Sequence, residues 1–275
     1  YYASVTQSIQ TTARRLGFND LVFNTFHDPM MEMKILEIAQ SIGAAGIIYT
    51  VKPQCLTEVE RLNHIMPIVI ISDKVDGLDV DTVELNNIKA GKLMAQHLLQ
   101  LGHKNIAFIS TMLNDMESSH VKRMTGLKDT IEKECNDCRF EIFSRNISPF
   151  EEMSDVNIEY ASGKRIMETI LKERAHDFTA IVAVNDTVAY GVLDALLDYG
   201  FMIPDDYSVC GFNNVFPSKF RFIALTTVEN YMIEKGRIAF HILNNRIMGG
   251  NESNRRKRVE YTPKLIIRDT TGRPR

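Results

Sequence analysis

Apolar and polar positions follow two different periods along this chain. From Ile88 to Leu101 the apolar positions recur at three- and four-residue steps, and Gly102 follows them, which is typical of a helix that ends at glycine. A short apolar run at 106–109 has the length of a buried strand. The same order of helix, glycine, polar turn and apolar run recurs around 16–23 and 199–209. This repetition predicts β-α units and therefore an α/β fold, with parallel sheets covered by helices.

The pattern predicts elements over nearly the whole chain. Strands are expected at 21–23, 46–49, 68–71, 106–109, 140–143, 180–184 and 207–209. Helices are expected at about 4–16, 29–42, 54–64, 88–101, 119–135, 158–174, 186–198 and 230–248. Because β-α folds normally open on a strand and this chain opens on a helix, a first strand is expected upstream of Tyr1.

A polar stretch at 111–120 interrupts the rhythm of the units. We therefore expect two sheets of about five strands each, with the second half beginning near Ser110. Open parallel sheets bind ligands at the carboxyl ends of their strands, so a cleft shared by the two halves is the expected binding site.

Charge and composition narrow the class of protein. The balance of 32 Lys+Arg against 35 Asp+Glu gives a net charge of -3, whereas a nucleic-acid-binding domain is expected to be basic. The one basic run, 255–258, is interpreted as a solvated loop flank before a strand. No apolar run approaches the roughly 20 residues that span a bilayer, so no membrane role is expected.

The sequence carries no recognisable catalytic or metal-binding motif. It has no Gly-rich phosphate loop, no nucleophile elbow and no zinc-binding His-Glu-x-x-His helix, so neither an enzyme nor a cofactor is expected. Its four cysteines are few and unevenly spread, which favours a reducing compartment. Cys135 and Cys138 have the spacing of a redox or zinc element, but they close a helix rather than open one, and a zinc site needs four ligands. No metal or redox chemistry is expected there.

Six segments together closely resemble the effector-binding core of the lactose/galactose repressor (LacI/GalR) family of bacterial transcription regulators. They occur in the order and spacing of that family and lie at 96–109, 123–126, 184–191, 203–214, 225–228 and 264–270. The resemblance covers nearly the whole chain.

The resemblance implies a periplasmic-binding-protein-like fold of two doubly wound parallel-sheet lobes joined by three crossovers. The first lobe is expected to hold 1–110 plus 229–255, and the second 111–228 plus 256–275. A helix-turn-helix headpiece for DNA is expected upstream of Tyr1, in agreement with the mildly acidic charge of the chain itself.

The implied function is that of a cytoplasmic repressor-type regulator that binds without turnover. A small effector in the cleft, expected to be a sugar, a sugar phosphate or acid, or a purine, would control operator DNA binding by a homodimer. The alternative is an extracytoplasmic sugar-binding protein of a transport system with the same fold. The segments 225–227 and 266–270 favour the regulator.

Three residues match ligand-contacting positions of the family in the second lobe. Arg123 offers a planar guanidinium to ligand hydroxyls or carbonyls, the alternative being an exposed helical arginine. Asn185 follows a buried strand and could instead cap the next helix. Asn213 stands where the family usually carries Asp; an amide accepts less strongly, which makes a ligand carboxylate, phosphate or keto group more plausible.

Three further residues match positions in the first lobe. Asp73 follows the strand at 68–71, and its alternative is a solvated turn residue. Tyr1 and Tyr2 match an aromatic position that can stack on a sugar or base, the alternative being disorder at the chain end. Asn86 replaces an Asp that is common in the family and is interpreted as structural.

Overall fold

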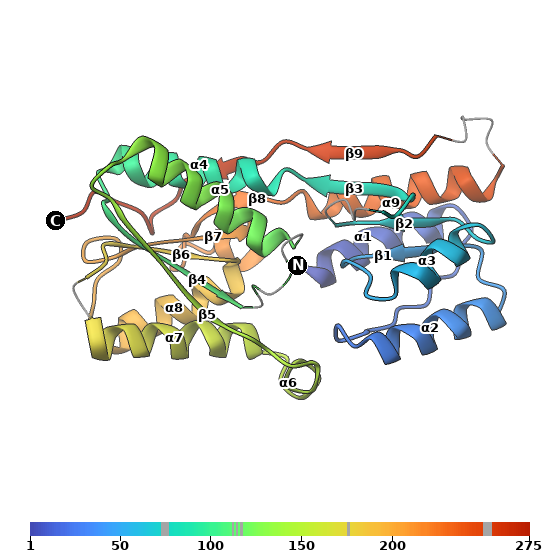
Figure 1. Cartoon of the computed structure of the whole chain (residues 1–275), viewed down its shortest axis with the longest axis horizontal. Helices are drawn as coiled ribbons and strands as arrows, with labels where there is room; N and C mark the ends of the chain where they lie inside the picture. The colour runs from blue at the N-terminus through green and yellow to red at the C-terminus, as the bar shows by residue number, and fades with distance from the viewer. Residues whose placement is uncertain (73–76, 112, 114, 116–117, 175–176, 250–254) are drawn as a thin grey trace. The chain divides into compact units, whose positions relative to one another are not determined.

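The computed structural model describes residues 1–275 except 73–76, 112, 114, 116–117, 175–176 and 250–254 (Figure 1). The chain divides into two compact units. Unit 1 comprises Tyr1–Leu85 and Tyr231–Tyr261, and unit 2 comprises Asn86–Asn230 and Thr262–Arg275. The chain passes from one unit to the other at three places, which confirms the three predicted crossovers.

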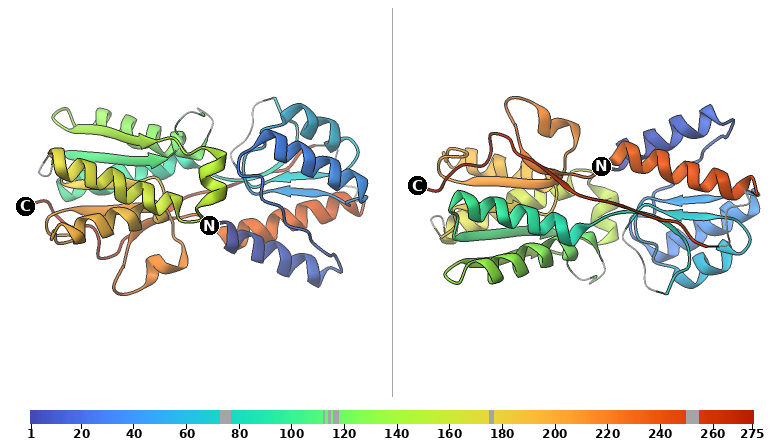
Figure 2. Two further views of the ribbon diagram at one scale, coloured as in Figure 1. Left: turned by 90° about the horizontal axis from the view of Figure 1, so that it is seen from below. Right: turned by 90° about the horizontal axis from the view of Figure 1, so that it is seen from above.

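Unit 1 is built on a parallel sheet with the strand order β1-β2-β3-β9. Its elements are α1 (Tyr2–Arg15), α2 (Pro29–Ser41), β1 (Ile47–Tyr49), α3 (Leu56–Asn63), β2 (Ile68–Ile70), β3 (Asp81–Leu85), α9 (Met232–Ile247) and β9 (Arg258–Tyr261). Helices α1 and α9 cover one face of this sheet, and α2 and α3 cover the other (Figure 2). The central strands β2 and β3 are buried along their whole length, as a doubly covered sheet requires.

Unit 2 is built on a larger sheet with the order β10-β8-β7-β6-β4-β5, in which only β10 runs antiparallel to its neighbour. Its elements are α4 (Asn87–Leu101), β4 (Asn105–Thr111), α5 (Ser119–Glu134), β5 (Arg139–Arg145), α6 (Pro149–Ser154), α7 (Ile158–Arg174), β6 (Ala180–Ala183), α8 (Asp186–Asp198), β7 (Ser208–Asn213), the 3-10 helix η1 (Phe216–Lys219), β8 (Thr226–Glu229) and β10 (Lys264–Ile266). Helices α4 and α5 cover one face, and α7 and α8 cover the other (Figure 1).

The bounds of α4 follow from the residues at its two ends. The side chain of Asn86 accepts a hydrogen bond from the backbone N–H of Lys89 at 2.9 Å and so satisfies one of the free donors of the first turn. This contact agrees with the structural interpretation of Asn86. At the other end Gly102 adopts the left-handed conformation, with φ of 98°, which glycine enters without the cost that a side chain imposes.

Helices α4 and α5 touch backbone to backbone through two glycines. A Cβ atom on Gly91 would lie 2.1 Å from the carbonyl oxygen of Arg123, and one on Gly126 would lie 2.0 Å from the carbonyl oxygen of Ile88. Real Cβ atoms do not approach that closely, so only glycine fits at either position. The contact fixes the part of α5 that carries Arg123.

The predicted lobe boundaries need correction. Residues 86–110 belong to unit 2 because α4 packs against α5 and because β4 pairs with β5 and β6. Residues 256–261 belong to unit 1 because β9 pairs with β3. Residues 229–230 also belong to unit 2, because they end its first segment, Asn86–Asn230.

Two predictions of individual elements also differ from the structure. The predicted strand at 21–23 pairs with no other strand of the described residues, and its side chains Leu21, Val22 and Phe23 are exposed. A strand needs a neighbour for its backbone hydrogen bonds, and an apolar run alone does not supply one. Within the part of the chain that the structure describes, the two sheets contain four and six strands rather than about five each.

Candidate functional site

Arg123 lies in the second turn of α5, and its side chain is buried, with 4% of its surface exposed. Its guanidinium donates from Nε to Asn87 Oδ1 at 2.9 Å, from Nη1 to the Val184 carbonyl at 2.8 Å and from Nη2 to Asn213 Oδ1 at 3.1 Å. The carbon at its centre lies 5.1 Å from the centroid of the Phe212 ring. Arg123 is therefore not an exposed helical arginine; it joins α4, α5 and the ends of β6 and β7.

Asn213 is the last residue of β7, at the carboxyl edge of the unit 2 sheet. Its Oδ1 accepts from Asn230 Nδ2 at 2.7 Å as well as from Arg123. The backbone of Asn213 has φ of 111°, and that of Asn214 has φ of 51°. Asn and Asp tolerate this region better than other side chains, so the backbone itself restricts which residues fit at these two positions.

Asn185 caps α8, which is the role expected from the sequence as the alternative to a ligand contact for this residue. Its Oδ1 accepts from the backbone N–H of Val188 at 2.9 Å, and its Nδ2 donates to Glu159 Oε1 at 2.8 Å. Asn185 is 5% exposed. The cap fixes the side chain in one orientation at the carboxyl end of β6, next to the Val184 carbonyl that Arg123 binds. A cap and a ligand contact are compatible roles, and the second stays a prediction.

Glu159, on α7, is a member of this cluster that sequence reasoning missed. Burial raises the pKa of its carboxyl, and the hydrogen bond from Asn185 opposes that rise. No motif around it signals a role, because its position in the cluster depends on the packing of α7 against α8.

A second buried carboxylate, Asp186, supports the loop that follows β7. Its Oδ2 accepts from the backbone N–H of Val215 at 2.9 Å and from the Ser218 hydroxyl at 2.7 Å, and its Oδ1 accepts from the Thr227 hydroxyl at 2.5 Å. Burial raises the pKa of Asp186 to about 6 against the pull of these three hydrogen bonds. Asp186 thereby ties β8 and the loop after Asn213 to the start of α8.

The remaining predicted contacts are the three residues of the first lobe, Tyr1, Tyr2 and Asp73. Tyr1 is half-buried, Tyr2 is 50% exposed, and their rings meet edge to face with centroids 5.1 Å apart. Both belong to unit 1, and their role in ligand binding stays a prediction. Asp73 lies outside the described residues. The structure thus brings together Arg123 and Asn213 directly, with Asn185 beside them.

Two other features of the sequence are accounted for by the structure. The basic run at 255–258 leads into β9: Arg256, before the strand, pairs with Asp79 at 3.3 Å, and Arg258, its first residue, pairs with Glu84. This confirms that the run flanks a strand.

The pair Cys135 and Cys138, for which no redox chemistry was expected, forms a disulfide bond. Two cysteines three residues apart at a helix end, with Cα atoms 5.5 Å apart, can form this bond, and a position at the end of a helix rather than at its start does not forbid it.

The comparisons with known proteins agree with this architecture. A family model described as a periplasmic binding protein-like domain matches residues 95–271. The transcriptional regulator DegA of Bacillus subtilis, described as of the helix-turn-helix (HTH) type, is 28% identical over 284 residues, which cover 99% of this chain and 77% of DegA. The HTH-type transcriptional repressor PurR of Haemophilus influenzae is 26% identical over 270 residues, which cover 98% of this chain and 76% of PurR.

A solved structure shows the same fold. A LacI-family transcriptional regulator from Enterococcus faecium with bound ribose superposes with a TM-score of 0.82 at 19% sequence identity, covering 99% of this chain and 94% of that one. None of the described helices has the length and apolar character that crossing a membrane requires. The matched family model spans more than half of the chain. The chain belongs to the periplasmic binding protein-like domain family, as an effector-binding core of the LacI/GalR type.

Proposed function

We propose that this chain is the effector-binding core of a transcription regulator and that it binds a sugar or sugar derivative through Arg123, Asn213 and Asn185 without turning it over. One observation carries the proposal: Arg123, buried on α5, donates a hydrogen bond to Asn213 at the end of β7. These two positions, matched to ligand contacts on sequence alone, meet at the carboxyl edge of a parallel sheet, where open α/β sheets bind ligands. Asp73, Tyr1 and Tyr2 stay predicted ligand contacts.

The cluster holds one cationic group, the Arg123 guanidinium, and one carboxyl group, that of Glu159, and we propose that this balance favours a neutral, hydroxyl-rich ligand. Arg123 supplies hydrogen-bond donors, while the amides of Asn185 and Asn213 supply both donors and acceptors. The carboxyl group of Glu159 lies 2.8 Å from Asn185 and would repel an anionic group placed beside it when ionised. We therefore rank a neutral sugar above a sugar phosphate or a sugar acid, whereas Asn213 alone pointed toward an anionic or keto group.

The regulatory part of the proposal rests on the relatives. DegA and PurR are described as HTH-type transcription factors, and the Enterococcus faecium regulator was solved with ribose. We propose that this core acts in the cytoplasm as a homodimer, because operators read by such regulators are two-fold symmetric. The effector would change operator affinity by its differential affinity for two arrangements of the protein, ordinarily about 1–3 kcal/mol.

A substitution at Asn185 separates the cap from the ligand contact. Serine is as good an N-cap as asparagine, so Asn185→Ser keeps α8 capped and removes only the amide group. The purified chain and this variant are first screened by thermal shift with D-ribose, D-xylulose, hypoxanthine and ribose 5-phosphate. The compound with the largest shift is then titrated by calorimetry.

We expect one of the neutral sugars to give the largest shift. We also expect Asn185→Ser to weaken its binding by about tenfold, or about 1.4 kcal/mol. The control is Arg165→Ala, which removes an exposed arginine of α7 in the same unit and should leave the Kd unchanged. Equal Kd values for wild type and Asn185→Ser would remove Asn185 from the site. A preference for ribose 5-phosphate would overturn the ranking by charge.

A further inference from the structure

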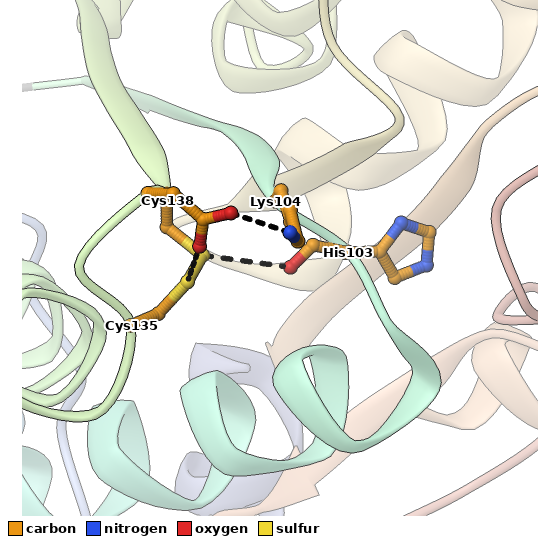
Figure 3. The surroundings of a disulfide bond; sticks show 5 residues. His103, Lys104, Cys135 and Cys138 are labelled. Atoms are coloured by element: carbon orange, nitrogen blue, oxygen red, sulfur yellow. Dashed lines mark hydrogen bonds and ion pairs between the residues drawn. A yellow bond between two sulfur atoms is a disulfide. The ribbon is translucent and has the colours of Figure 1, made fainter.

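The turn between α5 and β5 carries a disulfide bond that the proposed function does not use. Cys135 directly follows α5, and Cys138 directly precedes β5 (Figure 3). Their Cα atoms are 5.5 Å apart, within the usual range for a disulfide. Both cysteines are half-buried, whereas Asn136 and Asp137 between them are exposed. The bond therefore closes a four-residue turn at the surface of unit 2.

We propose that Cys135 and Cys138 form a reversible redox-modification site, a dithiol that a low-molecular-weight disulfide such as glutathione disulfide oxidises. In the cytoplasm, where the proposed function places the chain, disulfides are rare, and those that form are mostly transient and redox-sensing. That setting rests on the proposed function; the chemistry of the pair rests on the geometry of the turn.

The surroundings of the two sulfur atoms favour neutral thiols over thiolates when the bond is reduced. Sγ of Cys135 lies 3.4 Å from a carboxylate oxygen of Asp137, and Sγ of Cys138 lies 3.9 Å from the carbonyl oxygen of His103 (Figure 3). Both neighbours are acceptors, which a thiol S–H can use and a thiolate cannot. The turn also follows the C-terminus of α5, where the helix dipole is negative.

This environment is the reverse of an oxidoreductase motif. Catalytic Cys-x-x-Cys pairs open a helix, and the positive end of that helix stabilises the thiolate and makes the disulfide easy to reduce. At the end of α5 the thiolate lacks that stabilisation, so the disulfide should resist reduction by glutathione and yield to a stronger dithiol reductant. Once oxidised, the pair should therefore stay oxidised in the presence of glutathione rather than exchange disulfides rapidly.

A metal site fits the same residues less well. Cys135, Asp137 and Cys138 hold their potential ligand atoms within 4.8 Å of one another, which makes three ligands where a structural zinc site has four. Asp137 is also paired with Lys104 Nζ at 2.5 Å. The ring of His103 is occupied: Nδ1 lies 2.9 Å from Thr179 Oγ1, and Nε2 lies 2.9 Å from the Gly272 carbonyl.

The oxidation proceeds in two thiol–disulfide exchange steps. Cys138 packs against the hydrophobic core of unit 2, so Cys135, at the end of α5, is the thiol that glutathione disulfide reaches first. The Cys135 thiolate attacks one sulfur of glutathione disulfide, forms a mixed disulfide and expels one glutathione thiolate. The Cys138 thiolate then attacks Sγ of Cys135 and expels the second. Overall, the protein loses two electrons and two protons, and one glutathione disulfide becomes two glutathione molecules.

Oxidation should restrain the end of α5 against the start of β5, which is an edge strand of the unit 2 sheet. The backbone of Arg139 is already tied to Lys104, the residue before β4, because its N–H donates to the Lys104 carbonyl at 2.7 Å. Closing a loop of this size should raise the Tm of the oxidised protein by about 2–6 °C over the reduced protein.

Single cysteine variants test the assignment. The whole chain is prepared in a Cys55→Ala background, because Cys55 is a half-buried free thiol in unit 1, while Cys210 is buried. Three proteins are reduced with dithiothreitol and incubated with equimolar reduced and oxidised glutathione: the one with both cysteines of the pair, the Cys138→Ser variant and the Cys135→Ser variant. Intact mass and peptide mapping then locate any disulfide or glutathionyl group.

We expect the wild-type pair to lose two hydrogens and to retain no glutathione. Cys138→Ser should retain one glutathionyl group on Cys135, and Cys135→Ser should retain far less on Cys138. A pair that stays fully reduced, or equal labelling of both variants, would overturn the proposal. Stoichiometric zinc binding by the reduced protein, with protection from glutathione, would assign a metal site instead. All of these outcomes are independent of sugar binding and therefore of the proposed function.

Discussion

Replacing Arg123 by alanine tests whether the cluster at the carboxyl edge of unit 2 is a structural unit as well as a binding site. The sequence alone predicts that Arg123→Ala leaves the fold intact and removes most ligand affinity. The structure changes the first half of that prediction, because the guanidinium is 4% exposed and donates to three acceptors on different elements. Its removal should therefore cost stability even without ligand.

The size of the loss follows from the acceptors left behind. A buried polar group that loses its partner costs about 1–3 kcal/mol. Asn213 Oδ1 keeps a donor, Asn230 Nδ2 at 2.7 Å, so the loss falls chiefly on the hydrogen bonds that Arg123 donates to Asn87 Oδ1 and to the Val184 carbonyl. Water entering the vacated space recovers part of it. We expect Arg123→Ala to lower the free energy of unfolding of unit 2 by about 3 kcal/mol, and Arg123→Lys by about half as much.

Hydrogen exchange read by mass spectrometry measures this loss element by element. Peptides covering β6 and β7 should lose protection in Arg123→Ala, while β2 of unit 1 serves as an internal reference. The control Arg165→Ala removes an exposed arginine and should change stability by less than about 0.5 kcal/mol. If Arg123→Ala behaves like this control, the three acceptors are satisfied without the guanidinium, and the reasoning from burial fails.

Three further outcomes are expected. Asn213→Asp places a negative charge beside the guanidinium of Arg123, which lies 3.1 Å from Asn213 Oδ1 in the present structure. The ratio of the two Kd values measured by calorimetry should therefore shift by about tenfold in favour of D-ribose over ribose 5-phosphate. An unchanged ratio would place Asn213 outside the site. Burial lowers the pKa of His103 from 6.5, so the stability that its neutral form contributes should be complete above pH 6.5 and be lost as the pH falls from there through the folded-state pKa. The urea midpoint measured at pH 5, 6 and 7.5 should therefore rise with pH in the wild type and rise less in His103→Gln. Equal pH dependence in both proteins would contradict this prediction. Gly91→Ala puts a Cβ 2.1 Å from the Arg123 carbonyl oxygen, so urea unfolding should show unit 2 destabilised by about 2–4 kcal/mol. The control Lys92→Ala, on the exposed side of α4, should change the free energy of unfolding by less than about 0.5 kcal/mol. Equal effects of the two substitutions would show that the helices separate freely.

The elements of the fold that carry their own local signals could be predicted from the sequence. The helix before Gly102 and the buried strand after it are examples, because cap, period and glycine all lie within one short stretch. The membership of 86–110 in unit 2 could not be read that way, since it depends on the pairing of β4 with β5 and β6. Residues 21–23 have the composition of a strand, but composition does not provide a paired neighbour.

The candidate site also contains some residues that could be predicted from the sequence and others that could not. Arg123, Asn185 and Asn213 lie in recognisable segments, so their proximity could be expected from the resemblance. Glu159 could not be found, because only the packing of α7 on α8 brings it to Asn185. The disulfide at Cys135 could not be predicted for a different reason: four unevenly spread cysteines favour a reducing compartment over a disulfide scaffold, but they do not exclude one local bond between neighbours.

The most direct test of the account is a crystal structure of the chain grown with whichever panel compound gives the largest thermal shift. We expect an oxygen of that compound within hydrogen-bonding distance of the Arg123 guanidinium, with the amides of Asn213 and Asn185 in contact with the same molecule. A compound bound elsewhere, with Arg123 still joined to Asn87, Val184 and Asn213 as in the present structure, would contradict the proposed site.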